Sequence, residues 1–176
     1  LNDWSLHFAG TQVIEGRVWG VVSDLEQMPV ENCMVSFESN HLTAMTDEDG
    51  VWELWLPVGT LSLELSANGY CDQTLANIVV TDNSDQQIDA ELGAPYGYSS
   101  TNSIVQQAVG GGIFTQQFML MSDGACGWEY SIEVNAGEWL SVSPSSGFIM
   151  NGQSTEITVT FNTNGLQGTI YTGELE

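Results

Sequence analysis

Basic residues are almost absent from this chain. Its 176 residues include 23 Asp and Glu but only one base, Arg17, which gives a net charge of −22. Nucleic acids and anionic membrane surfaces are bound through Lys and Arg side chains that neutralise phosphates. The composition therefore predicts that neither nucleic acid nor an anionic membrane is a partner. Self-repulsion of the acidic surface favours solubility.

Long apolar runs are also missing. No stretch approaches the roughly 20 apolar residues of a membrane-spanning helix, so we expect no membrane insertion. The first residue is Leu, and no signal peptide is recognisable, which indicates a mature or excised piece. Hydrophobic residues make up 42% of the chain, enough for a packed core. A single basic residue leaves trypsin-like proteases little to cleave, which suits a secreted, extracellular or cell-surface protein.

Cysteine and histidine are scarce. The only histidines are His7 and His41, and no Cys-x-x-Cys pair is present, so a structural zinc site is not expected. One disulfide can form among three cysteines, and a Cys33–Cys71 bridge within one domain fits their positions. The alternative is three buried thiols. Neither histidine lies in a glycine-framed nucleophile motif, and short strands leave no cleft for a carboxylate pair, so we predict no enzyme.

What the chain does contain is a series of short strand patterns. Between residues 46 and 70, Trp52, Leu54 and Leu56 alternate with polar or outward residues, then a Pro-Gly turn precedes a second alternating run. This period of two is typical of a half-buried antiparallel strand. Similar runs predict strands at 14–22, 31–38, 41–46, 51–56, 61–67, 74–80 and 86–92, then at 103–109, 113–122, 127–134, 138–143, 154–161 and 168–175.

The fold class predicted from this pattern is all-β, with two tandem antiparallel β-sandwich domains. Residues 93–102, rich in Gly, Pro, Ser and Asn, form the predicted linker. The domains are then residues 14–92 and 103–176. Residues 1–13 are a leader strand or the remnant of a preceding module.

The first domain resembles the carboxypeptidase regulatory-like domain, a transthyretin-like sandwich. The resemblance lies in the segments Ile14-Glu-Gly-Arg-Val18, Met28-Pro-Val-Glu-Asn-Cys-Met-Val35, Thr46-Asp-Glu-Asp-Gly50, Leu56-Pro-Val-Gly59 and Ala67-Asn-Gly-Tyr70. It implies a non-catalytic accessory module of secreted and cell-surface proteins.

The second domain is similar to the immunoglobulin-like modules of the BACON and choice-of-anchor type in bacterial extracellular proteins. The most specific segment is Trp139-Leu-Ser-Val-Ser-Pro-Ser-Ser-Gly147, supported by 111–118, 151–159 and 168–173. Together the two resemblances imply an extracellular structural or adhesion module: a spacer, a stalk or a subunit of a surface fibre. The alternative is an accessory region of a larger secreted hydrolase, for substrate proximity or carbohydrate binding. Both families are defined by fold, which carries little functional information.

Candidate interaction residues are aromatic. Trp19 and Trp55 are out of phase with their apolar neighbours, so we expect their rings to face outward, where an indole can contact a protein or stack on a sugar. Trp4, Leu6 and Phe8 alternate in the leader. They belong either to a strand of a lost module or to a strand donated to a sheet edge of an adjacent subunit. The expected partners are proteins, through self-association or neighbouring modules, with polysaccharide as the second possibility.

The tightest acidic cluster is Asp47, Glu48 and Asp49, followed by Gly50. Adjacent loop carboxylates offer oxygen ligands for Ca²⁺, although an ordinary turn has the same composition. We expect no other cofactor.

Overall fold

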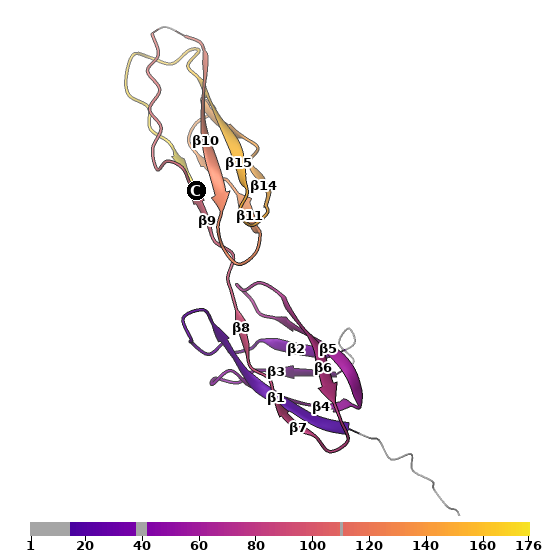
Figure 1. Ribbon diagram of the computed structural model, residues 1–176. Coiled ribbons are helices and arrows are strands. Elements are labelled where there is room, and N and C mark those ends of the chain that lie inside the picture. The colour runs from indigo at the N-terminus through magenta and orange to yellow at the C-terminus, as the bar shows by residue number, and fades with distance from the viewer. Residues whose placement is uncertain (1–14, 38–41, 110) are drawn as a thin grey trace, which may run out of the picture. The chain divides into compact units, whose positions relative to one another are not determined.

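The computed structural model describes residues 15–37, 42–109 and 111–176. Within these ranges the chain forms sixteen strands and no helix, so the predicted all-β class is confirmed (Figure 1). No helix there is long and apolar enough to cross a membrane. The chain divides into two compact units, Leu1–Leu92 and Gly93–Glu176.

The N-terminal unit packs two sheets against each other. One sheet has β1 (Glu15–Asp24) at its centre, with β4 (Val51–Pro57) on one side and β7 (Asp85–Gln87) followed by β8 (Ala90–Leu92) on the other. The second sheet contains, in spatial order, β3 (Leu42–Met45), β2 (Met34–Phe37), β5 (Gly59–Ser66) and β6 (Gln73–Val80). The pairings β1–β4, β2–β3, β2–β5 and β5–β6 are antiparallel, as predicted, whereas β7 and β8 run parallel to β1.

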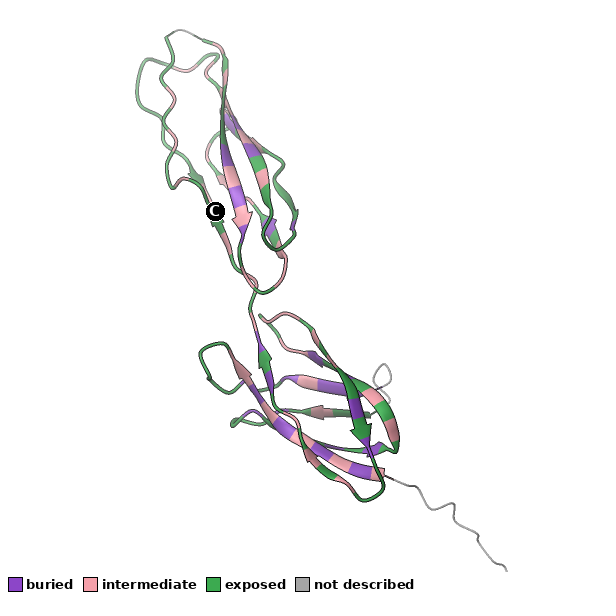
Figure 2. Cartoon of the chain, in the orientation of Figure 1, coloured by how far each residue is buried: buried purple, intermediate pink, exposed green. Residues whose placement is uncertain are grey.

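Strict alternation in the sequence produces the core of this unit. In β4 the residues Trp52, Leu54 and Leu56 are buried, whereas their neighbours are exposed (Figure 2). Alternate side chains of a strand point to opposite faces, so one face of each sheet becomes dry. The buried core consists of Val18, Val22, Val30, Cys33, Val35, Phe37, Trp52, Leu54, Leu56, Leu63, Leu65, Ile78, Val80, Ala90 and Leu92.

The C-terminal unit has a core of its own. Its main sheet contains, in spatial order, β13 (Leu140–Ser143), β15 (Ser154–Asn162), β10 (Ile113–Ser122) and β9 (Gly97–Ser99). Two further pairs are β11 (Trp128–Ser131) with β14 (Ser146–Ile149), and β12 (Val134–Asn135) with β16 (Glu174–Leu175). The buried residues between them are Phe118, Leu120, Tyr130, Leu140, Ile149, Ile157 and Val159.

Three sequence-based boundaries change in the C-terminal unit. The stretch 93–102 is not a plain linker, because β9 within it pairs with β10, and the carbonyl of Tyr96 accepts the N–H of Asp123 at 2.9 Å. Residues 103–109 form no strand, although their pattern predicts one. Conversely, β14 lies between the predicted strands 138–143 and 154–161, where the sequence pattern predicts none.

The predicted Cys33–Cys71 disulfide is wrong. Cys33 is a free thiol with no exposed surface, and it packs in the hydrophobic core with Val30 and Val35. Its backbone N–H donates to Thr46 Oγ1 at 2.8 Å, which holds the start of β2 against the neighbouring turn. Because the thiol faces the core of the sandwich, it acts as a small buried hydrophobe.

Candidate functional site

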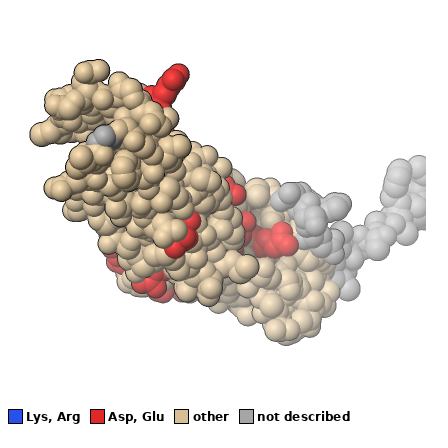
Figure 3. Space-filling model, turned by 90° about the horizontal axis from the view of Figure 1, so that it is seen from above, with Lys and Arg blue, Asp and Glu red and all other residues tan. Residues whose placement is uncertain are grey.

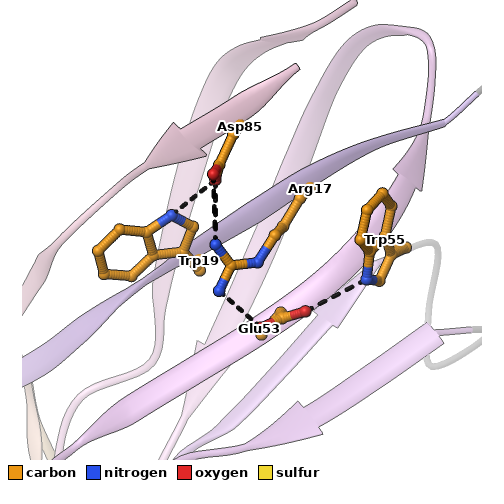
Figure 4. Close-up of polar contacts among 5 residues, drawn as sticks. All are labelled: Arg17, Trp19, Glu53, Trp55 and Asp85. Atoms are coloured by element: carbon orange, nitrogen blue, oxygen red, sulfur yellow. Dashed lines mark hydrogen bonds and ion pairs between the residues drawn. The ribbon is translucent and has the colours of Figure 1, made fainter. Parts of the chain in front are cut away.

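The outer face of the β4–β1–β7 sheet carries a connected group of polar and aromatic side chains. Val18 and Val22 on β1 point into the core, so the alternate residues Arg17 and Trp19 point outward. Strand register places Trp55 of β4 and Asp85 of β7 opposite Arg17, and Glu53 of β4 opposite Trp19. We call the set Arg17, Trp19, Glu53, Trp55 and Asp85 the tryptophan face (Figure 4).

A continuous hydrogen-bond network joins these five side chains. Arg17 Nη2 contacts Glu53 Oε2 at 2.8 Å, and Arg17 Nη1 contacts Asp85 Oδ1 at 3.2 Å. The two carboxylates then accept the indole N–H groups: Trp19 donates to Asp85 at 2.9 Å, and Trp55 donates to Glu53 at 3.2 Å. The guanidinium carbon also lies 5.3 Å from the centroid of the Trp19 ring, a cation–π distance.

The electrostatics of the site centre on the one basic residue of the chain. The hydrogen bond from Arg17 is the largest cause that lowers the pKa of Glu53, and the same bond is the largest cause that raises the pKa of Arg17. One guanidinium serves two carboxylates, so the tryptophan face keeps a net charge of −1. Arg17 therefore orders the surrounding acids and is not free to bind an anionic partner.

The two indoles differ in exposure. Trp55 has 53% of its surface exposed, whereas Trp19 is half-buried under the guanidinium of Arg17. Both rings therefore point outward, as predicted from their position between buried residues of β1 and β4. Trp55 presents a large apolar ring to solvent with its N–H already satisfied by Glu53. Such a ring can contact a partner without a polar group left unpaired on burial.

The three carboxylates proposed for calcium do not converge. Asp47 Oδ1 accepts the backbone N–H groups of Asp49 at 3.0 Å and Val51 at 2.9 Å, which closes an Asx-type turn into β4. Among the described residues, no group of three or more His, Cys, Asp or Glu side chains could hold a metal ion. Calcium binding by Asp47, Glu48 and Asp49 stays a prediction that has no structural support.

Three predicted interaction residues lie outside the described ranges, and three residues of the tryptophan face are not predicted from the sequence. Trp4, Leu6 and Phe8 lie outside the described residues. Arg17, Glu53 and Asp85 are not identified as site residues by the sequence, although the solitary charge of Arg17 is the signal that could have drawn attention to it. Glu53 and Asp85 carry no such signal, because they are two acids among 23.

These features define a class of protein: two β-sandwich modules in series, one of which presents an ordered aromatic and acidic surface. The family model of the carboxypeptidase regulatory-like domain matches residues 17–93, and that of the viral BACON domain matches residues 98–174. The predicted tandem of these two domain types is confirmed. The matching family model is that of the viral BACON domain, whereas the resemblance noted from the sequence is to BACON-type modules of bacterial proteins. No curated protein sequence matches the chain significantly.

Several solved structures show partial likeness. A mutant type II cohesin–X-dockerin complex from Acetivibrio cellulolyticus has 18% identity and a TM-score of 0.39, and the match covers 44% of this chain and 57% of that one. The major pilin subunit of Bacillus cereus has 6% identity and a TM-score of 0.39, with 90% and 62% covered. A candidate carbohydrate-binding protein from Bacteroides uniformis has 11% identity and a TM-score of 0.38, with 85% and 80% covered. TM-scores below 0.4 at such low identity carry no information about function.

Proposed function

We propose that this chain is a non-catalytic structural module of a secreted or cell-surface protein. It acts as a spacer, a stalk or a subunit of a surface fibre, and it works through protein–protein contacts. Two tandem units support this role, because each contains a cluster of buried hydrophobic residues of its own. The two matched domain types support it as well.

The observation that carries the proposal is the ordered, exposed indole of Trp55. Tryptophan is enriched among the residues that dominate protein–protein binding energy. The contact of Trp55 with Glu53, itself bound to Arg17, fixes the ring before any partner arrives. A side chain that is already ordered loses less conformational entropy on binding. The tryptophan face is therefore a preorganised contact surface.

The charge of the face indicates the chemistry of its partner. Arg17 is already neutralised, and Glu53 and Asp85 leave a net negative charge, within a chain of net charge −22. The partner surface is then neutral or basic, with an apolar patch that covers Trp55. Oppositely charged surfaces associate faster, and this advantage falls as the salt concentration rises.

Trp55→Ala tests the proposal, with Val79→Ala as the control. Val79 is 57% exposed and lies on β6 of the other sheet of the same unit, so it controls for loss of an exposed apolar side chain. Sedimentation velocity of the full chain over a range of concentrations measures self-association. We expect Trp55→Ala to weaken association at least about tenfold, the size of a tryptophan hot spot, and Val79→Ala to change it less than about twofold. Equal association constants for all three proteins would reject the tryptophan face as the contact surface.

A second function is favoured by a specific feature, the outward rings of Trp19 and Trp55 beside carboxylates that can accept hydrogen bonds from sugar hydroxyls. On this alternative the chain is the carbohydrate-binding accessory region of a larger secreted hydrolase. A glycan array distinguishes the two functions. A glycan that binds the wild-type chain and is lost in Trp55→Ala, without any self-association, supports the accessory region and contradicts the structural module.

A further inference from the structure

Acidic residues are unevenly distributed along the chain. Residues 93–122 contain no Asp, Glu, Lys, Arg or His, although the chain as a whole has 23 acids. This stretch includes β9 and β10 of the C-terminal unit. Figure 3 shows one face of the molecule, where Asp and Glu are scattered over a mostly uncharged surface. In so acidic a chain, two copies can approach with least repulsion through such neutral segments.

Half of β10 has an open backbone edge. On one side β10 pairs with β15 along its length, but on the other side β9 reaches only from Ser122 to Leu120. Beyond that point Met119 still exchanges two bonds with Ser100: its carbonyl accepts the Ser100 N–H at 2.8 Å, and its N–H donates to Ser100 Oγ at 2.9 Å. The edge from Phe118 back to Ile113 then has no strand partner in the described part of the chain.

The ladder shows which backbone groups are left over. In an antiparallel pair, both peptide groups of alternate residues face the same side. Gly112 and Ser122 bond towards β15, since their carbonyls accept the N–H groups of Thr163 and Gly152 at 2.8 Å. The even-numbered residues of β10 therefore face β15. The N–H and C=O groups of Ile113, Thr115 and Gln117 face the open edge.

The first half of β10 is largely exposed. Gln116 is in phase with the buried Phe118 and Leu120, yet its side chain is exposed. Its amide donates to Gln106 at 2.9 Å, a side-chain contact from a segment that forms no ladder with β10. Four large apolar residues of the C-terminal unit are strongly exposed, namely Val105, Val109, Ile113 and Ile170.

We propose that this edge of β10 accepts a β-strand from a second copy of the chain, supplied by residues 4–8. Exposed edges pair readily with extended segments, whose main-chain bonds give affinity and whose alternate side chains enter the neighbouring core. The donated strand is a second contact between copies, without which the tryptophan face alone does not hold two copies together, and the inference rests on the proposed structural function.

Three properties of the sequence assign the donor. Trp4, Leu6 and Phe8 alternate, so one face of a strand formed by residues 4–8 is wholly apolar. Residues 4–8 contain no acid, which matches the uncharged edge. Five residues of strand extend about 17 Å, close to the length from Ile113 to Gln117. The segment also precedes β1 in the sequence.

Two variants separate acceptor from donor. Thr115→Pro removes an N–H that faces the open edge and leaves the bonds to β15 in place, because proline is tolerated at such edge positions. Thr115→Ala is its matched control, since it loses the side chain but keeps the N–H. A chain without residues 1–13 lacks the donor and keeps the acceptor. Circular dichroism and thermal unfolding confirm that each variant remains folded.

Sedimentation velocity then gives a decisive pattern. The wild-type chain and Thr115→Ala are expected to form oligomers, whereas Thr115→Pro and the shortened chain are monomers. A mixture of the two monomeric proteins is expected to form a 1:1 dimer, because one retains the donor and the other the acceptor.

Three results would overturn strand donation. One is a shortened chain that still forms oligomers. Another is equal behaviour of Thr115→Pro and Thr115→Ala. The third is a monomeric wild-type chain in which removal of residues 1–13 lowers the hydrogen-exchange protection of the Thr115 amide. This result would show that the strand comes from the same chain. If these variants form oligomers and only Trp55→Ala dissociates them, strand donation fails but the proposed structural function stands.

Discussion

Gly20→Ala tests the parallel pairing in the N-terminal unit, which the sequence does not predict. Gly20 lies on the inner side of β1, between the segments that pair with β7 and β8. A Cβ atom added there would overlap the carbonyl group of Ile88, which connects β7 to β8, and would lie 3.2 Å from Trp52 Nε1. Because the overlap is with backbone, the chain at Ile88 has to move away from β1.

The magnitude follows from the bonds at this crossing. The Ile88 N–H donates to the Trp19 carbonyl at 2.7 Å, and the Val21 N–H donates to Asp89 Oδ1 at 2.9 Å. Their loss costs about 1 kcal/mol each, and overpacking costs about 1–3 kcal/mol. Replacement of glycine within a strand returns roughly 0.5–1 kcal/mol. We therefore expect the free energy of unfolding of this unit to fall by about 2–4 kcal/mol.

Differential scanning calorimetry measures the effect. For a domain of this size, about 4–8 °C is lost per kcal/mol, so the midpoint should fall by roughly 8–32 °C. Gly168→Ala is the control, because a Cβ there has no neighbour within 4 Å, and its midpoint should be unchanged. A Gly20→Ala midpoint within 2 °C of the wild-type value would refute the close packing of β7 and β8 on β1.

Three further predictions concern individual residues. Arg17 lowers the pKa of Glu53, so the stabilisation that Glu53 contributes is complete above the ordinary pKa of 4.5 and is lost as the pH falls through the lower pKa of the folded state. In NMR titrations, Arg17→Gln should raise the pKa of Glu53. An unchanged pKa would contradict the hydrogen-bond network. Burial raises the pKa of the Cys33 thiol, so iodoacetamide should modify Cys33 only after unfolding, as mass spectrometry can show; rapid native modification would contradict its place in the core. Addition of Ca²⁺ should leave the unfolding midpoint unchanged, because Asp47 serves the turn; a rise that Asp49→Asn removes would restore the calcium site.

The strands that were predicted well are those with clear alternation. Trp52, Leu54 and Leu56 in β4, and Leu63 and Leu65 in β5, are buried as their period of two predicts. β14 was missed because Pro and Gly in its neighbourhood are typical of a turn. Residues 103–109 show the opposite failure, since local alternation predicts a strand but cannot show whether a neighbouring strand is available to pair with it.

The site was predicted only in part for a similar reason. The outward direction of Trp19 and Trp55 follows from phase within one strand. The pairing of Arg17 with Glu53 and Asp85 depends on the register between three strands. Glu53 and Asp85 are 36 and 68 residues away from Arg17 along the chain. The free Cys33 likewise depends on which face of β2 meets the core. Such relations between distant segments are not contained in local patterns.

Two tandem sandwiches, each with a hydrophobic core of its own, form the scaffold of the protein. Scanning calorimetry of Leu63→Ala and Ile157→Ala tests this claim, because each side chain is fully buried in a different core and its truncation costs about 2–5 kcal/mol. We predict two unfolding transitions, with Leu63→Ala lowering the midpoint of one and Ile157→Ala lowering that of the other. A single transition lowered equally by both substitutions would contradict the claim.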